Sequence, residues 1–193
     1  MPNEPKRRSK REELIIAGLE EINRCGITNF SLRSVAQKAG VSCAAPAKHF
    51  GDKHGFVAAI IEYVNAQWNE EQQRILSESG ESTRERLVAF SVGYIKFLVE
   101  KPHFRSILML KDDELDQEFP AIGRGKTTKL TLDLVDKYCS EVGMDKETRL
   151  RKFYIVRSLI YGASLMFDNK ELPYNEKVLE IVRQSIDREF DLA

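Results

Sequence analysis

The sequence has 193 residues, of which 42% are hydrophobic and 31% charged, and its formal net charge is zero. This composition is typical of a soluble globular protein, and a chain of this length can bury a core of its own. The sequence contains no apolar run long enough for a membrane span, and no apolar stretch follows its basic N-terminus, so neither a membrane protein nor a secretory signal is expected.

The charges are distributed unevenly along the chain. Residues 1–60 contain ten Lys and Arg against six Asp and Glu, whereas acidic residues outnumber basic ones in the remainder. Between Lys6 and Arg11 there are five basic residues and no acidic one. A basic end on an acidic body is typical of a protein that docks one face on phosphates, although an ordinary solvated tail has the same charge.

The cysteines and histidines predict no covalent or metal framework. Cys25, Cys43 and Cys139 are an odd number and widely spaced, which argues against disulfides and favours a reducing cytoplasm. The histidines form no cluster with them at metal-ligand spacing. We therefore expect a cytoplasmic protein with no metal and no cofactor.

Apolar residues recur at spacings of three and four, and alternation at period two is missing, so the sequence predicts an all-α fold of about nine helices. The first helix has an apolar stripe over residues 14–25. Ser9 and Glu12 resemble a capping box at its start, and Gly26 can end it.

Two short helices and several longer ones follow. Ser31 and Ser42 are placed to cap the short helices, and a long helix runs from Phe56 to near Gly80. Further apolar stripes predict helices over residues 87–98, 104–108, 122–142, 150–167 and 179–190. The expected architecture is a small three-helix unit, residues 1–55, joined by a continuous helix to a larger helical body, residues 56–193.

The segment 31–42 has the spacing of a helix-turn-helix. Ala36 is small enough to let the second helix cross the first closely, and Gly40 suits the left-handed conformation that ends a helix. Val41 can fill the gap between the two helices. Ser42 is then expected to cap the second helix, whose exposed side can enter a major groove.

With its flanking residues, this segment resembles the tetracycline-repressor (TetR) family of bacterial regulators. The resemblance runs from about residue 11 to residue 60 and is carried by Gly26, Phe30–Ser31, Val35–Ala36, Ala39–Gly40–Val41–Ser42, His49–Phe50 and Asp52–Lys53. It implies a helix-turn-helix DNA-binding domain over residues 1–55 and a helical ligand-binding and dimerisation domain over residues 56–193. The implied function is that of a ligand-responsive repressor that binds a palindromic operator as a dimer.

Carried onto this sequence, the resemblance makes residues 42–50 the recognition helix. The residues expected to contact phosphates are Ser31, Arg33, Ser42, Lys48, His49 and Lys53. A packed histidine is the alternative for His49. The candidates to face bases are Cys43, Ala44 and Ala45, whose reach is short. Val41, Phe50 and Ala36 are expected in the core.

The recognition helix departs from the family pattern at two positions. Ala47 stands where the family usually has tyrosine, and Ala45 where a hydroxyl residue is common. Pro46 also removes a backbone donor, near the first turn, where that loss is mildest. We hypothesise that the basic arm, residues 6–11, supplies the missing affinity, so that removal of residues 1–10 flattens the salt dependence of DNA binding.

The larger body is expected to hold the dimer interface and any ligand. The family implies a homodimer through the last two helices, about 147–168 and 175–190, and the small residues at 161–164 allow a close helix approach; an intramolecular core is the alternative. An unknown small-molecule effector would bind near Tyr94, Phe97, Phe104, Arg157 and Tyr161, although an aromatic stripe is more often plain core. Arg157 could face an anionic ligand, a carboxylate across the dimer, or solvent.

Three other functions remain to be weighed. An enzyme is not expected, because the sequence has no glycine-rich phosphate loop, nucleophile elbow or metalloprotease helix. A redox sensor would use Cys43, whose thiol follows the expected helix cap at Ser42. A helix-turn-helix protein that acts through a protein partner is the third, because Ala45 and Ala47 leave few groups for DNA. Double-stranded DNA remains the expected partner, with no membrane.

Overall fold

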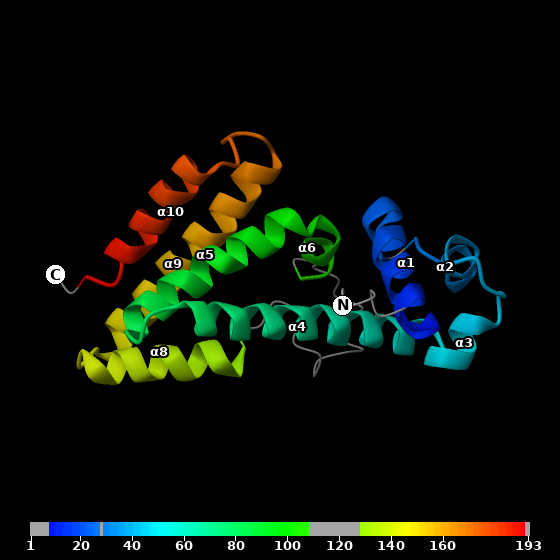
Figure 1. Cartoon of the computed structure of the whole chain (residues 1–193), viewed down its shortest axis with the longest axis horizontal. Helices are drawn as coiled ribbons and strands as arrows, with labels where there is room; N and C mark the ends of the chain where they lie inside the picture. The colour runs from blue at the N-terminus through cyan, green and yellow to red at the C-terminus, as the bar shows by residue number, and fades with distance from the viewer. Residues whose placement is uncertain (1–7, 28, 109–127, 192–193) are drawn as a thin grey trace, which may run out of the picture. The chain divides into compact units, whose positions relative to one another are not determined.

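A computed structural model describes residues 8–27, 29–108 and 128–191, and within these ranges it contains helices but no strands. The helices are α1 (Lys10–Cys25), α2 (Leu32–Lys38), α3 (Ala45–Phe50), α4 (Lys53–Glu78), α5 (Thr83–Glu100), α6 (Pro102–Leu108), α8 (Lys129–Glu141), α9 (Lys146–Asp168) and α10 (Glu176–Arg188) (Figure 1). The predicted all-α class is confirmed. The part of the helix expected before residue 128 lies outside the described residues. No helix among the described residues is long and apolar enough to cross a bilayer.

The helices form two compact units. Unit 1 comprises Met1–Ala66 and Pro102–Gly125, and unit 2 comprises Gln67–Lys101 and Lys126–Ala193. The division therefore falls within α4, whose first part belongs to unit 1 and whose second part belongs to unit 2. Unit 1 extends beyond the predicted boundary at residue 55 because the first side chains of α4 pack against α1.

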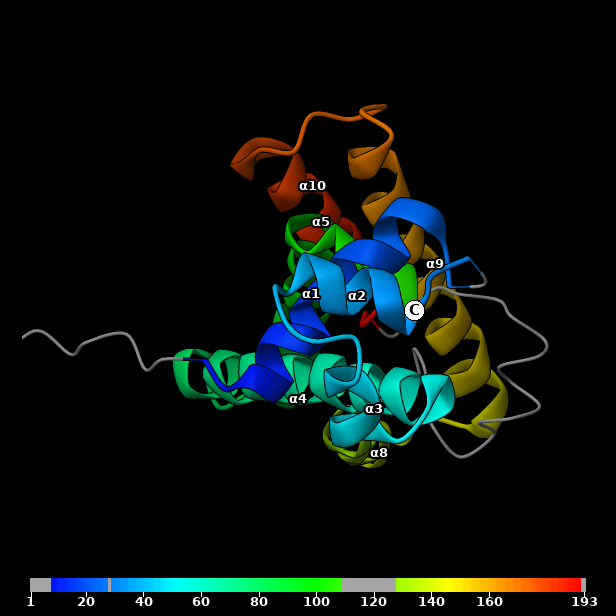
Figure 2. The ribbon, with the colours of Figure 1, turned by 90° about the vertical axis from the view of Figure 1, so that its right-hand side faces the viewer.

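The core of unit 1 lies where α1 meets the start of α4. Phe56 is fully buried and its ring lies 6.0 Å from that of Phe30 and 4.9 Å from that of Phe50. Gly18 of α1 faces it so closely that a Cβ at this position would be 2.4 Å from Phe56 Cζ. A glycine within a helix is about 1 kcal/mol less favourable than an alanine. At Gly18 this cost is accepted because only a residue without a Cβ leaves room for the Phe56 ring. The arrangement of α1, α2 and α3 can be followed in Figure 2.

Unit 2 is organised around α5, against which α8, α9 and α10 all pack. Its apolar core joins Ile95 of α5 to Ile160 and Phe167 of α9 and to Leu179 and Ile186 of α10. These residues repeat at helical spacing on α9 and α10, which is why the sequence pattern located both helices correctly.

A buried polar link joins α4 to α8 within unit 2. Gln72 is fully buried, and its Nε2 donates to Thr131 Oγ1 at 2.7 Å. The hydroxyl of Thr128, the N-cap of α8, donates to Gln72 Oε1 at 2.9 Å. Every polar atom of the buried amide group thus faces a hydroxyl, as burial in an apolar interior requires.

The end of the described chain is fastened to the body of unit 2. The Tyr138 hydroxyl donates to the carbonyl oxygen of Phe190 at 2.5 Å, and Lys152 Nζ donates to that of Asp191 at 3.0 Å. Arg84 of α5 also forms an ion pair with Asp191, at 2.8 Å. The residues that follow α10 are therefore held by α5, α8 and α9.

Candidate nucleic-acid interface

The first helix of the predicted helix-turn-helix, α2, begins at a complete capping box. Ser31 Oγ accepts a hydrogen bond from the backbone N–H of Ser34 at 3.1 Å, and Ser34 Oγ accepts one from the N–H of Ser31 at 3.3 Å. These bonds satisfy donors that the start of a helix leaves open. The predicted cap at Ser31 is confirmed, as is the cap of α1 at Ser9.

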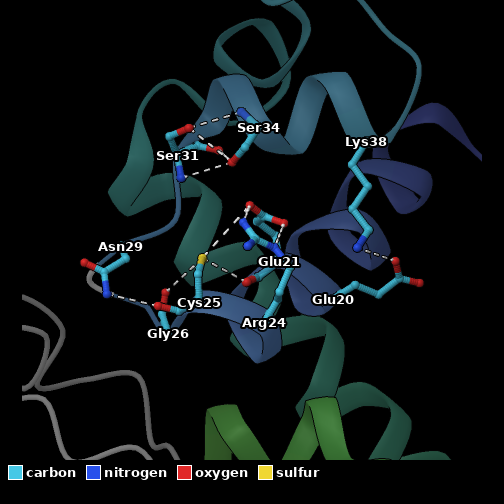
Figure 3. A network of polar contacts seen from close by, with 9 residues as sticks. All are labelled: Glu20, Glu21, Arg24, Cys25, Gly26, Asn29, Ser31, Ser34 and Lys38. Carbon is cyan, nitrogen blue, oxygen red and sulfur yellow. Dashed lines mark hydrogen bonds and ion pairs between the residues drawn. The ribbon is translucent and has the colours of Figure 1, made fainter.

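A polar network fastens α2 to α1 (Figure 3). Glu21 of α1 is only 5% exposed, and its carboxylate accepts hydrogen bonds from Arg24 at 2.6 and 3.1 Å. The bond to Arg24, aided by Ser34, holds the pKa of Glu21 below its ordinary value despite burial. Lys38, the last residue of α2, pairs with Glu20 at 3.0 Å. Both ends of α2 are therefore tied electrostatically to α1.

The turn after α2 is a Schellman motif centred on Gly40. Gly40 has φ of 65°, a conformation that favours glycine. Its N–H donates to the carbonyl of Gln37 at 3.2 Å, and the N–H of Val41 donates to that of Ala36 at 3.0 Å. These two bonds satisfy carbonyls left open at the end of α2, and the predicted turn at Gly40 is confirmed.

The second helix, α3, starts later than the sequence predicts. Its first residue is Ala45 and its N-cap is Ala44, which makes no side-chain capping bond, so the predicted cap at Ser42 is wrong. Because Val41 is used to end α2, the chain turns once more, with the N–H of Ala45 bonded to the carbonyl of Ser42 at 2.9 Å. The recognition helix is therefore six residues long, and the buried Pro46 lies in its first turn.

The residues predicted to contact DNA all lie in unit 1, on α2, the turn, α3 and the start of α4. The exposed ones are Ser31, Arg33, Ser42, Cys43, Ala44, Lys48 and His49. Ala45 is half-buried. Lys53 is also half-buried, and its Nζ lies 4.6 Å from the centre of the Phe30 ring. Ala47, noted in the sequence only as a departure from the family, is exposed on α3 as well.

The residues predicted as core behind this surface are buried to different degrees. Ala36 is fully buried, whereas Val41 and Phe50 are half-buried. Phe50 is covered in part by Arg11, whose guanidinium carbon lies 5.2 Å from the ring centre. Arg11, the last residue of the basic arm, is thus held beside α3. Residues 6 and 7 of the arm lie outside the described residues.

The five residues predicted to form a ligand pocket do not share one site. Tyr94 and Arg157 line a cavity of about 110 Å³ in unit 2. Tyr161 contacts Arg157, which donates a hydrogen bond to its hydroxyl, and the Phe97 ring lies 6.4 Å from that of Tyr94, but neither lines the cavity. Phe104 lies in unit 1, on α6.

Much of the cavity wall comes from residues that the sequence did not single out. Trp68, Tyr138 and Phe190 line it from α4, α8 and the segment after α10. These residues are far apart in the chain, and a helical stripe indicates which face of a helix is apolar but not which helices meet. No local signal in the sequence could have grouped them.

Helices α9 and α10, predicted as the dimer interface, expose large apolar side chains. Leu150 and Tyr154 of α9 are each 70% exposed, and Leu165 of α9 and Ile181 of α10 are each 54% exposed. A Cβ added at Gly162 would meet no atom within 4 Å. This glycine is therefore not explained by packing within the described chain, and large exposed apolar side chains on the same two helices make them candidates for an interface.

The cysteines differ in environment. Cys25 Sγ donates to the carbonyl of Glu21 at 3.1 Å, and burial raises the pKa of the Cys139 thiol. Cys43 is exposed and precedes the N-cap of α3, so it does not follow a helix cap as predicted. Among the described residues, no group of three or more His, Cys, Asp and Glu side chains is placed to hold a metal ion.

Comparison by sequence relates the chain to a transcription regulator. It is 30% identical over 93 residues to the HTH-type transcriptional regulator BetI of Stenotrophomonas maltophilia. The match covers 48% of this chain and 47% of the relative, so the chain spans about half the length of this curated protein. No protein-family model matches the sequence.

Comparison by structure covers nearly the whole chain. A TetR family transcription regulator from Marinobacter aquaeolei has a TM-score of 0.73, with 18% identity over 93% of this chain and 94% of that one. The fatty acid degradation regulator FadR from Bacillus halodurans has a TM-score of 0.66, with 18% identity over 94% and 96%. The chain has the fold of the TetR-family transcription regulators, and about half of its sequence is related to an HTH-type regulator.

Proposed function

We propose that the protein is a transcription regulator that binds double-stranded DNA through α2, the turn and α3 of unit 1. One observation carries the proposal: residues 31–51 contain Arg33, Lys38 and Lys48 but no Asp or Glu, and they form two short helices with an exposed side. A surface of this kind can approach phosphates without repulsion. The curated relatives are transcription regulators, not enzymes, which supports this reading over catalysis.

The exposed side chains of α2, the turn and α3 indicate how this surface would bind. Cys43, Ala44 and Ala47 are short, so base recognition is confined to apolar contacts such as those with thymine methyl groups. Arg33 and Lys48 supply charge. Most of the affinity therefore comes from phosphates, and binding depends steeply on salt.

Selection of bound duplexes from a random DNA pool at moderate salt tests this proposal. An enriched palindrome supports it, whereas no enriched sequence would favour action through a protein partner. On the selected site, Lys48→Ala should reduce the slope of log affinity against log salt by about 1. Lys146→Ala, an exposed lysine at the start of α9 that removes the same charge, should leave the slope unchanged.

We also propose that the protein binds DNA as a homodimer formed through α9 and α10. The exposed Tyr154, Leu165 and Ile181 support it, because a second copy would remove them from water. Two recognition helices related by a two-fold axis would then read half-sites roughly 34–36 Å apart.

Sedimentation of two variants tests the interface. Ile181→Glu places a charge on the proposed interface and should yield monomers that bind the palindrome weakly. Leu132→Glu is the matched control, because Leu132 is 40% exposed on α8, outside the proposed interface. Dimers that survive Ile181→Glu, or are lost equally in both variants, would refute the proposed interface.

Finally, we propose that a small molecule bound in the cavity of unit 2 controls DNA binding, with repression as the default state. α4 supports this coupling, because it begins beside α3 and contributes Trp68 to the cavity wall. A ligand that favours one position of α4 would shift the population of DNA-competent dimers. Loss of the operator complex on adding a cavity ligand, in a gel-shift assay, is the expected result.

A further inference from the structure

The wall of the unit 2 cavity is mainly aromatic. Its rings are Trp68, Phe90, Tyr94, Tyr138, Phe153 and Phe190, and the rings of Trp68 and Tyr94 lie 4.7 Å apart. Aromatic pairs that stack or meet edge to face gain more than the area they bury. The composition of the wall therefore favours an aromatic ligand.

The volume of the cavity limits that ligand to one ring. The cavity measures about 110 Å³, and an engineered apolar cavity of about 150 Å³ binds benzene in another protein. One six-membered ring with a small substituent therefore fills the space. A long acyl chain or a fused ring system exceeds it.

Two of the three cations that line the cavity are bound to other groups of the protein. Arg149 forms an ion pair with Asp136 at 2.5 Å. Lys152 Nζ donates hydrogen bonds to the carbonyl oxygens of Glu189 and Asp191, at 2.5 and 3.0 Å. Neither cation therefore depends on an anionic ligand for a partner.

Arg157, the third cation, is engaged as well. Its guanidinium donates to the hydroxyl of Tyr161 and lies 4.8 and 5.6 Å from the ring centres of Tyr161 and Phe153. It takes part in further interactions besides these. Because Tyr161 does not line the cavity, this contact holds the guanidinium toward a residue outside the cavity wall.

The balance of charge on the wall favours an uncharged ligand. Burial of a charged group is costly unless the group gains a partner. An anion would find three cations that already have partners within the protein. A cation would find no counter-charge, because none of the described residues that line the cavity is Asp or Glu.

The hydroxyl of Tyr94 is the polar group of the wall that is available to such a ligand. It has no hydrogen-bond partner among the described residues. The hydroxyls of Ser91, Thr128, Thr131 and Tyr138 all bond to other groups of unit 2. Burial raises the pKa of Tyr94, so its hydroxyl keeps its proton at neutral pH and can donate it.

We infer that the cavity binds an uncharged, phenol-type compound of one ring, with the ring among the aromatic side chains and its oxygen accepting a hydrogen bond from Tyr94. This inference rests on the proposed effector role of the cavity, but its test needs no DNA. Buried tyrosine hydroxyls usually have a partner, and the oxygen of the ligand supplies one. The ring supplies the rest of the affinity through its packing against the aromatic wall.

Two pairs of matched probes separate the hydrogen bond from the charge. Phenol and toluene have the same size and differ in one oxygen, whereas benzamide and benzoate have the same shape and differ in charge. Trp68 is the only tryptophan in the chain and lines the cavity, so its fluorescence reports occupancy when it is excited beyond the absorption of the probes. Benzamide should bind about tenfold more tightly than benzoate, because the carboxylate would lose its water without gaining a new partner.

The variant Tyr94→Phe removes the hydroxyl and keeps the ring. It should weaken the binding of phenol about fivefold, as expected for the loss of one hydrogen bond, and leave the affinity for toluene within about twofold of wild type. Toluene binding also shows that the cavity remains folded. Tyr154→Phe is the matched control, because Tyr154 is 70% exposed and does not line the cavity. This control should bind both probes as the wild type does.

Several results would overturn the inference. These are tighter binding of benzoate than of benzamide, an unchanged affinity for phenol in Tyr94→Phe, an equal loss of phenol and toluene binding in that variant, or no response of Trp68 to phenol. Failure of the proposed function appears elsewhere, as the absence of a selected DNA site. A protein that binds phenol through Tyr94 but selects no DNA would support the cavity and refute the regulator.

Discussion

Replacement of Gln72 by leucine tests the buried link between α4 and α8. The variant keeps the side-chain volume but loses two hydrogen bonds, to Thr131 at 2.7 Å and to Thr128 at 2.9 Å. Each bond contributes about 1 kcal/mol net, and a buried hydroxyl without a partner costs about 1–3 kcal/mol. The hydroxyl oxygens of Thr128 and Thr131 lie 3.0 Å apart and can still form a hydrogen bond with each other, which offsets part of that cost. We expect a loss of about 2 kcal/mol in the free energy of unfolding.

Urea unfolding followed by Trp68 fluorescence measures this loss, because Trp68 lies one turn before Gln72 on the same helix. Gln73→Leu is the matched control: Gln73 is exposed, so its replacement should change stability by no more than about 0.5 kcal/mol. Equal stabilities of Gln72→Leu and Gln73→Leu would refute the argument that the amide is buried and satisfied.

Three further changes probe other contacts. Gly18→Ala should destabilise unit 1 by about 1–2 kcal/mol in chemical unfolding, because the new Cβ would lie 2.4 Å from Phe56 Cζ and overpacking outweighs the gain in helix propensity. Glu21→Gln should flatten the acid dependence of unit 1 stability measured by circular dichroism. Arg24 lowers the pKa of Glu21 in the folded state, so the stabilisation is present above the ordinary value of 4.5 and is lost as pH falls through the lowered value. Arg84→Met should lower the stability of unit 2 by up to about 1 kcal/mol, since its two partly exposed carboxylate partners limit the gain from pairing.

Each of these has an outcome that contradicts it. A more stable Gly18→Ala variant would show that the Phe56 ring moves aside at no cost. Parallel stability curves for wild type and Glu21→Gln from about pH 6 to about pH 3 would show that the carboxylate has the same pKa in the folded and unfolded chain. An unchanged Arg84→Met protein would show that the hydrogen bonds of Tyr138 and Lys152 are sufficient to hold the chain end.

Local signals in the sequence predicted helix ends where one residue settles the geometry. Ser9, Ser31 and Gly40 act within four residues of their own position, so their roles could be read from spacing alone. Ser42 was assigned wrongly because two competing local structures meet there. The end of α2 uses Val41, and this displaces the start of α3.

The sites depend on contacts between distant segments, which spacing does not encode. Phe104 has the same apolar signature as Phe97, yet α6 packs against α1 in unit 1. In the sequence, Tyr94 stood out by its polar tip within an aromatic stripe, and Arg157 by its charge within an apolar run. Their shared cavity became visible only with the structure, because Trp68 and Phe190 complete its wall.

The attachment of the chain end has a practical consequence for anyone who labels or immobilises this protein. Phe190 is at once part of the cavity wall and the acceptor of the Tyr138 hydrogen bond. A purification tag or surface linker at the C-terminal end would therefore pull on the segment that contributes Phe190 to that wall, whereas one at the N-terminal end adjoins the basic arm. An internal attachment point on an exposed stretch of α8, such as Lys137, leaves both ends of the chain untouched.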